Sequence, residues 1–229
     1  MIEAKLPIIS ILIALLFFST GCVVNDQITG VRYFDGSNVV GSGKLVSKVR
    51  EAGQYSALVN HCSANINIRC GIPNELKVTA EDNLIDLITT SVVNGVLHIS
   101  VKNNTRTSSA ITLDIGVNNI QSVEVSGSGN VVIVGVSGNE FHALISGSGT
   151  ITANGKVKDA NYQIQGSGSI DCRSILANNV VAVVSGSGNI DLSSSVKLDA
   201  SIFGSGNIRY CGNPKILTHV SGSGRISSH

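Results

Sequence analysis

Residues 145–151 read Ile-Ser-Gly-Ser-Gly-Thr-Ile, and this pattern decides the fold because it recurs along the chain. A Gly-Ser-Gly triplet occurs six times after residue 126, at intervals of 20, 19, 20, 18 and 18 residues. The glycines of these triplets are Gly127, Gly129, Gly147, Gly149, Gly166, Gly168, Gly186, Gly188, Gly204, Gly206, Gly222 and Gly224. A nearly fixed period of this length is typical of solenoids, in which each repeat stacks on its neighbour.

The residues that flank the triplets repeat as well, and all of them are β-branched aliphatics. Two residues before each triplet stand Val125, Ile145, Ile164, Val184, Ile202 and Val220. Two residues after each triplet stand Val131, Ile151, Ile170, Ile190, Ile208 and Ile226. If like residues of successive coils lie in line, these positions form two inward-facing ladders between parallel strands ~4.8 Å apart. Each triplet then marks a corner, where we expect glycine to turn the chain with a positive φ.

The sequence therefore predicts an all-β parallel β-helix, or β-solenoid, with about 18–20 residues per coil. Flexible linkers would not carry aliphatic residues at both flanks six times, and a β-sandwich would require neighbouring repeats to run antiparallel. Strand-like runs separated by turn residues also fill residues 44–115 and include an Asn94-Gly95 hairpin turn. We expect residues 39–120 to form an N-terminal β region that extends or caps the solenoid of residues 121–229. A further triplet, Gly41–Gly43, is out of phase with the other six.

The first 21 residues are predicted to be a lipoprotein signal peptide. The apolar run Leu6–Phe18 would be ~20 Å long as a helix, short of the ~30 Å core of a bilayer. Ser19-Thr20-Gly21-Cys22 resembles a bacterial lipobox, which implies cleavage before Cys22 and lipidation of that residue. The alternative is an ordinary signal peptide followed by a coincidental cysteine. With a lipid anchor at Cys22 and a tether over residues 22–38, the protein is expected to be exported to the cell envelope, in the periplasm or at the outer membrane.

Composition and cysteine spacing exclude some classes of function. Only 14% of the residues are charged, the formal net charge is +1, and no basic stripe occurs, so nucleic-acid binding has no support. Cys62, Cys70, Cys172 and Cys211 are either small core residues or contribute one disulfide, and the sequence leaves the pairing open. Neighbouring His61 and Cys62 would point to opposite faces of a strand, which disfavours a metal site. No cofactor is expected.

The chain from about Val31 to Ile226 resembles the head GIN domain family of putative autotransporter adhesins. The resemblance rests on Arg32-Tyr33-Phe34-Asp35, on the strand Asn94–Ile99, on the recurrent Ser-Gly-Ser-Gly-Asn, and on the last coil from Ile208 to Pro214 and from Val220 to Gly224. It implies a secreted or lipid-anchored bacterial protein built from β-helical repeats. The family name points to adhesion, and the resemblance brings no catalytic residues.

Candidate reactive side chains lie in one row of positions that faces outward between the two ladders. Each position of this row comes three residues after a triplet. These positions are Val132, Thr152, Asp171, Asp191, Arg209 and Ser227. Asp171 and Asp191 would lie on adjacent coils, with Arg209 on the next one. Two carboxylates this close can share a proton, bind calcium or act on a glycoside or uronate. The alternative is an Asp191–Arg209 surface ion pair beside an ordinary Asp171.

Two functional hypotheses follow. The first is a non-enzymatic, lipid-anchored β-helix of the cell envelope, adhesin-like or ligand-binding, whose partner is a surface polysaccharide or protein. The second is a carbohydrate-active β-helix enzyme that uses Asp171 and Asp191. The coils are close to the minimal length and leave no room for loops that would enclose a sugar, and the five histidines are scattered. The sequence therefore favours the non-enzymatic hypothesis.

Overall fold

A computed structural model of the chain describes residues 39–102 and 105–229. The expected signal peptide, the expected lipidation site at Cys22 and the tether up to residue 38 lie outside these residues. The described body consists of strands and one short 3-10 helix, η1 (Ile85–Leu87), so the all-β prediction is confirmed. In that part of the chain, no helix has the length and apolar character needed to cross a bilayer.

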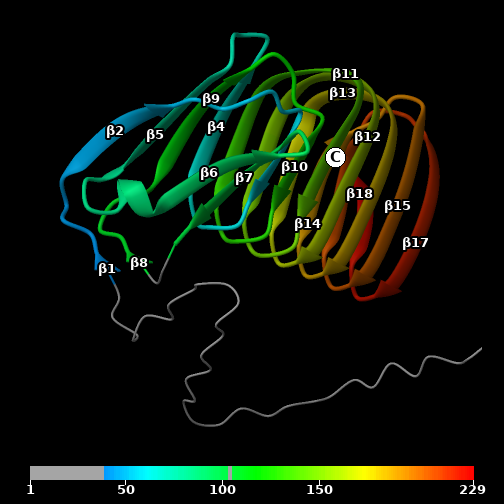
Figure 1. The fold of residues 1–229 in the computed structure, drawn as a ribbon. Helices are drawn as coiled ribbons and strands as arrows, with labels where there is room; N and C mark the ends of the chain where they lie inside the picture. The colour runs from blue at the N-terminus through cyan, green and yellow to red at the C-terminus, as the bar shows by residue number, and fades with distance from the viewer. Residues whose placement is uncertain (1–38, 103–104) are drawn as a thin grey trace, which may run out of the picture. The chain divides into compact units, whose positions relative to one another are not determined.

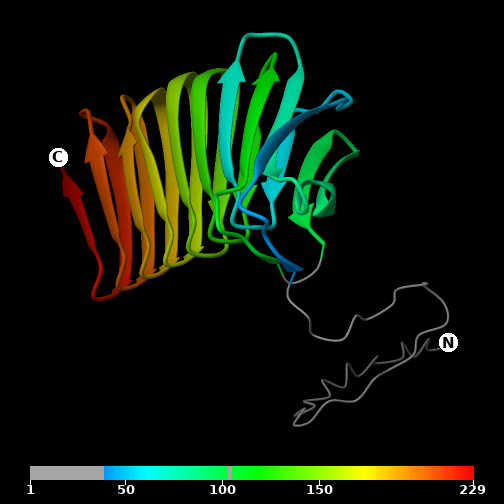
Figure 2. The ribbon, with the colours of Figure 1, turned by 90° about the vertical axis from the view of Figure 1, so that its left-hand side faces the viewer.

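Two sheets of parallel strands form the walls of the solenoid, and the chain passes from one to the other at the corners (Figures 1 and 2). The entry sheet, which leads into the corners, contains β7 (Val96–Val101), β3 (Ala57–Asn60), β10 (Ser122–Val125), the second halves of β11 (Asn130–Ile145), β12 (Thr150–Gly166) and β13 (Ser169–Gly186), then β15 (Lys197–Gly204) and β17 (Lys215–Gly222). The exit sheet, which leaves the corners, contains β9 (Thr112–Val117), β4 (Asn65–Cys70), the first halves of β11, β12 and β13, then β14 (Asn189–Ser193), β16 (Asn207–Cys211) and β18 (Arg225–Ser228).

The register of these strands places like residues of successive repeats in line, which confirms the predicted β-helix. Val125, Ile145 and Ile164 pair in order on the entry sheet, and the same ladder continues to Val220. The ladder that starts at Val131 runs along the exit sheet to Ile226 in the same way. Both ladders are buried in every coil before the last. Burying one such side chain stabilises the fold by ~1.5–3 kcal/mol, so the ladders supply much of the driving force.

The corners require glycine for two reasons, and only one of them, a positive φ, was expected from the sequence. Neither Gly127 nor Gly147 has a positive φ, so that expectation is wrong for these two residues. A Cβ atom on Gly127 would instead lie 2.6 Å from the carbonyl oxygen of Cys62 on the adjacent coil, closer than real Cβ contacts come. In later coils both causes act together, as at Gly204, which has a φ of 138° and is equally crowded by the carbonyl of Gly186. Close stacking of corners is therefore the general constraint.

The N-terminal region both extends and caps the solenoid. Strands β3 and β4 form a coil directly against β10 and β11, and β7 and β9 form the next coil outward. The corner between β3 and β4 is Cys62-Ser63-Ala64, whose backbone lies against Gly127 and Gly129. The order of coils in space thus differs from their order in sequence, because the chain leaves after β4 and returns at β7.

Antiparallel strands cover the end of the solenoid that these coils form (Figure 1). β6 (Ile88–Val93) pairs with β7, and β5 (Glu75–Glu81) pairs with β9 and with β2 (Leu45–Arg50). Arg50 ties this cap together, since its guanidinium donates to the carbonyl oxygens of Ile85 and Ile88 at 2.7 Å each. Leu84, Ile85 and Ile88 are buried, so the core is closed at this end.

The out-of-phase triplet Gly41-Ser42-Gly43 belongs to the cap and is not a corner. The Gly43 N–H donates to Glu81 Oε1 at 2.9 Å, and the Ser108 N–H donates to Glu81 Oε2 at 3.2 Å. Glu81 is buried, and a Cβ atom at Gly41 would collide with its carboxylate. Gly41 thus makes room for a buried carboxylate that accepts backbone hydrogen bonds, whereas Gly43 has a positive φ of 79° and no atom crowding its Cβ position.

The four cysteines of the described residues are all free thiols. Cys172 lies in the core, where burial raises the pKa of its thiol to about 12. Cys62, Cys70 and Cys211 are half-buried. Of the alternatives that the sequence left open, the structure shows the unpaired one.

Candidate functional site

The outer face of the exit sheet carries the row of side chains that the sequence placed three residues after each triplet. Because side chains alternate along a strand, these positions point outward between the two inward ladders of this wall. Pairing of the strands extends the row in both directions, and its members are Asp114, Asn67, Val132, Thr152, Asp171, Asp191, Arg209 and Ser227. We call these eight residues the outer row. The structure thus brings Asp171, Asp191 and Arg209 together on β13, β14 and β16.

Asp191 and Arg209 form a bidentate ion pair between neighbouring strands. Arg209 Nε lies 2.6 Å from Asp191 Oδ1, and Arg209 Nη2 lies 2.7 Å from Oδ2. The Asp191 side chain is only 8% exposed, and His229 Nε2 approaches the same carboxylate at 3.9 Å. Hydrogen bonds from Arg209 to an anion favour its charged form, so they raise the pKa of the guanidinium. Both oxygens of Asp191 are occupied by this partner.

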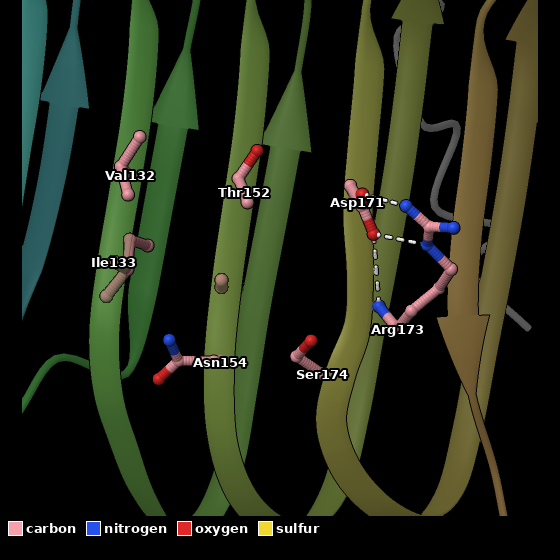
Figure 3. Close-up of a pocket in the computed structure, with 8 residues that line it drawn as sticks. Val132, Ile133, Thr152, Asn154, Asp171, Arg173 and Ser174 are labelled. Atoms are coloured by element: carbon pink, nitrogen blue, oxygen red, sulfur yellow. Dashed lines mark hydrogen bonds and ion pairs between the residues drawn. The ribbon is translucent and has the colours of Figure 1, made fainter.

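Asp171 is paired as well, with an arginine that sequence reasoning missed. Arg173 Nη2 donates to Asp171 Oδ2 at 2.6 Å, and Arg173 Nε donates to Oδ1 at 3.0 Å (Figure 3). The hydrogen bond from the Arg173 side chain is the main cause that holds the pKa of Asp171 below its usual value. The signal was present in the sequence, because residues i and i+2 of a strand share a face.

These pairings determine what the carboxylates can do chemically. A general acid in glycoside hydrolysis needs a raised pKa, whereas the pKa of Asp171 is lowered. Two carboxylates that share a proton would need to face each other, but each of these faces its own guanidinium. The described residues contain no group of three His, Cys, Asp or Glu side chains placed to hold a metal ion. The arrangement suits binding through fixed hydrogen-bonding groups.

Shallow hollows lie along the outer row. The central hollow has a volume of about 340 Å³ and spans β11, β12 and β13 (Figure 3). The polar side chains around it are Thr152, Asn154, Asp171, Arg173 and Ser174, with the exposed Val132 at one side. The C-terminal hollow, of about 360 Å³, is lined by Asn189, Asn207, Arg209, Arg225 and Ser227. The N-terminal hollow, of about 250 Å³, includes Asn67, Arg69, Glu75, Lys77 and Asp114.

A second outward row runs along the exit sheet and contributes Asn189, Asn207 and Arg225 to the C-terminal hollow, and sequence reasoning did not single it out. It lies one residue after each corner and contains Asn130, Thr150, Ser169, Asn189, Asn207 and Arg225. Two hydrogen bonds between amides link neighbouring coils here. Asn207 Nδ2 donates to Asn189 Oδ1 at 2.9 Å within the row, and Asn130 Nδ2 donates to Asn65 Oδ1 of β4 at 3.1 Å. We call these six residues the amide row. Its signal is the Asn, Thr or Ser that directly follows five of the six triplets.

Solved structures with this fold come from proteins described as adhesins and as a lipid binder. A crystal structure of a putative adhesin from Bacteroides fragilis is 21% identical, with a TM-score of 0.69, and the match covers 84% of this chain and 100% of that one. A putative adhesin from Parabacteroides distasonis matches with 22% identity and a TM-score of 0.56 over the same shares of the two chains. A putative lipid binding protein from Parabacteroides distasonis matches over these shares too, with 22% identity and a TM-score of 0.53. At these identities the likeness shows the fold alone.

No curated protein matches the chain. A family profile does match, and it covers residues 54–214, which include most of both sheets. The Arg32–Asp35 stretch, one basis of the expected resemblance, lies outside the matched residues. Because the match covers more than half of the chain, this protein belongs to the family described as putative auto-transporter adhesin, head GIN domain.

Proposed function

We propose that the protein is a non-enzymatic, adhesin-like component of the cell envelope that binds a surface polysaccharide with the outer face of its exit sheet. Membership of an adhesin family and the adhesin descriptions of solved structures support a surface or exported role. To that role we add a polysaccharide as the ligand, the outer face of the exit sheet as the binding surface, and a membrane anchor on the lipidated Cys22. The relative described as a lipid binding protein keeps a lipid ligand among the outcomes of the test.

The observation that carries this proposal is the pairing of both carboxylates within a hollowed, polar face. Asp171 and Asp191 each accept two side-chain hydrogen bonds from an arginine, which supports a structural role for both carboxylates over a catalytic one. What remains on the face is a set of fixed amides, hydroxyls and guanidiniums at strand spacing. Such groups bind sugar hydroxyls without reacting with them.

A polysaccharide fits this face better than a protein partner does. Protein interfaces are centred on buried aromatic and aliphatic anchors. The outer row offers only one aliphatic side chain, Val132, and no aromatic one. Hydrogen-bonding groups instead recur every ~4.8 Å along the solenoid, and a repeating polymer can use several of them at once.

The test is binding of the mature chain to a glycan array and to isolated envelope proteins and lipids. We expect glycan binding that weakens about thirtyfold in Thr152→Ala/Ser174→Ala, since two hydroxyl contacts at about 1 kcal/mol each are lost from the central hollow. Asn161→Ala, on the outer face of the entry sheet, is the matched control and should bind like the parent. Binding only to proteins or lipids, or equal binding by both variants, would refute the proposal.

Catalysis is tested in the same preparation. Incubation with each bound glycan should release no new reducing ends, and Asp171→Asn should leave that result unchanged. Turnover that disappears in Asp171→Asn or Asp191→Asn would establish the enzymatic alternative in place of the proposed function.

The anchor has its own experiment, which does not depend on the ligand. Cys22→Ala should move the protein from the membrane fraction to the soluble fraction, because several acyl chains worth ~0.8 kcal/mol per buried CH₂ would be missing. Replacement of Ser19 by Leu, the usual residue at that position of a lipobox, should preserve membrane retention. A Cys22→Ala protein that stays with the membrane would contradict lipidation at this residue.

A further inference from the structure

The C-terminal end of the solenoid has an unusual distribution of charge. From residue 200 to residue 229 the chain contains Arg209, Lys215 and Arg225 but no aspartate or glutamate. These residues build most of the last two coils, from β15 to β18. The protein as a whole has a formal charge of only +1, so this end carries a positive charge that the rest of the chain balances. A cluster of one sign attracts ligands of the other sign.

The hollows of the exit sheet show the same contrast at close range. The central hollow is lined by one carboxylate and one guanidinium, Asp171 and Arg173. The N-terminal hollow has two side chains of each sign around it. The C-terminal hollow is lined by Arg209 and Arg225 and by no carboxylate. Arg209 already pairs with Asp191 of the neighbouring strand, which leaves the hollow with one uncompensated positive charge.

Arg225 supplies that charge, and its position suits a ligand. It lies on β18 in line with Asn207 and, one strand further, with Asn189. It is exposed, and no carboxylate lies within ion-pair distance of it among the described residues. The guanidinium therefore stands at the end of the amide row with its donors free. Ser227, two residues along the same strand, adds a hydroxyl on the same face.

We propose that the C-terminal hollow is a subsite for the carboxylate of an acidic polysaccharide, with Arg225 as the residue that binds the carboxylate. This inference rests on the proposed polysaccharide-binding function and names its ligand class. The planar guanidinium matches a carboxylate in a two-bond geometry. Asn189, Asn207 and Ser227 provide the donors and acceptors that the hydroxyls of a uronic acid need. The bidentate hydrogen bonds to Asp191 fix the guanidinium of Arg209, which also lines the subsite.

The experiment compares polygalacturonate with its fully methyl-esterified form, which has the same backbone and no charge. Titration calorimetry on the mature chain should give at least tenfold tighter binding of the acid polymer, because a hydrogen bond to a charged group contributes ~1.5–3 kcal/mol. Arg225→Gln should abolish this preference, whereas Arg225→Lys should retain part of it, since the charge remains and the two-bond geometry is lost.

Arg69→Gln is the matched control, because Arg69 is also an exposed arginine on the exit sheet but borders the hollow with balanced charge. It should keep the full preference for the acid polymer. Equal affinity for the acid and the ester overturns the subsite while leaving polysaccharide binding intact. A preference that survives Arg225→Gln, or tighter binding of polyglutamate than of polygalacturonate, overturns it too. Binding of neither polymer, with neutral glycans still bound on the array, also removes the subsite and not the proposed function.

Discussion

At the scale of single residues, a corner glycine is fixed by the carbonyl oxygen of the adjacent coil. Gly168 shows this without a contribution from φ, because its φ is not positive. A Cβ atom there would lie 2.6 Å from the Gly149 oxygen and 2.6 Å from Ile145 Cγ2. Both obstacles belong to the packed core and cannot move without separating the coils. The cost of a methyl group at this position is therefore steric.

Gly168→Ala should lower the free energy of unfolding by at least about 2 kcal/mol, in the range found when a packed core is overfilled. The matched control is Gly53→Ala, since a Cβ atom at Gly53 meets no atom within 4 Å and its φ is not positive. That variant should stay within about 0.5 kcal/mol of the parent. Urea denaturation followed by circular dichroism measures both, and similar stabilities for the two variants would show that the corners are loosely stacked.

Residue spacing predicted which side chains share the outer row but not how they pair. The period placed Asp171, Asp191 and Arg209 on adjacent strands, and the structure does so. Whether Asp171 pairs with a residue of the next strand or of its own depends on side-chain rotamers. Arg173 reaches it from two residues away on β13, where the register with β12 shifts between Thr152 and Asn154. A repeat pattern has no information on such a local irregularity.

At the scale of strands, the Gly-Ser-Gly period predicted every coil from β10 onward and was silent on the earlier ones. β3 and β4 join the solenoid through the corner Cys62-Ser63-Ala64, which keeps only the serine of the motif. The strands that complete the next coil, β7 and β9, are separated from them in sequence by the antiparallel cap strands β5 and β6. Pairing between segments so far apart in sequence depends on tertiary packing. The sequence therefore predicted that these segments are strands but not which strands they pair with.

Arg50 connects β2 to η1 and β6 by donating to two backbone carbonyls at 2.7 Å. Burial is the main cause that lowers the pKa of its guanidinium, and Asp86 opposes that effect. The side chain thus satisfies acceptors that have little water around them.

Arg50→Met keeps the aliphatic part of this side chain and leaves both carbonyls without their donor. We expect a loss of about 2 kcal/mol or more in unfolding free energy, since each unsatisfied acceptor costs ~1–3 kcal/mol. Lys48→Met on the same strand removes only an exposed ion pair with Asp86 and should cost less than about 1 kcal/mol. Thermal unfolding of the two variants measures the difference, and a smaller loss in Arg50→Met than in Lys48→Met would contradict this role for Arg50.

At the scale of the whole described body, the two ends of the solenoid differ. The N-terminal end is covered by β2, β5, β6 and η1, whereas the outermost C-terminal coil has no strand beyond it in the described residues (Figure 2). Ile216 and Val220, which continue core ladders, are 40% and 43% exposed there, while Leu198 and Ile202 one coil inward are fully buried. At the C-terminal end, side chains that continue the core are therefore partly exposed to solvent.

Stability of such a stack is close to a sum over coils and the contacts between neighbours. Removal of residues 213–229 deletes β17 and β18. Leu198 and Ile202 then lose the coil that covers them and become partly exposed, as Ile216 and Val220 are in the parent. We expect the shortened chain to fold, with a lower free energy of unfolding and a smaller urea m-value, because less surface becomes exposed on unfolding. Removal of residues 39–54, which include Arg50, should instead uncover Ile85 and Ile88 and cause aggregation.

The shortened chain also allows folding and ligand preference to be tested separately. It retains the central hollow and the Asp191–Arg209 pair but lacks Arg225. It should therefore bind neutral glycans like the parent and show no preference for polygalacturonate over its ester. Calorimetry on this chain, together with circular dichroism to establish that it is folded, makes both measurements on one sample. A folded short chain that still prefers the acid polymer would place the carboxylate subsite elsewhere on the solenoid, and an unfolded one would show that the last coil belongs to a single cooperative unit.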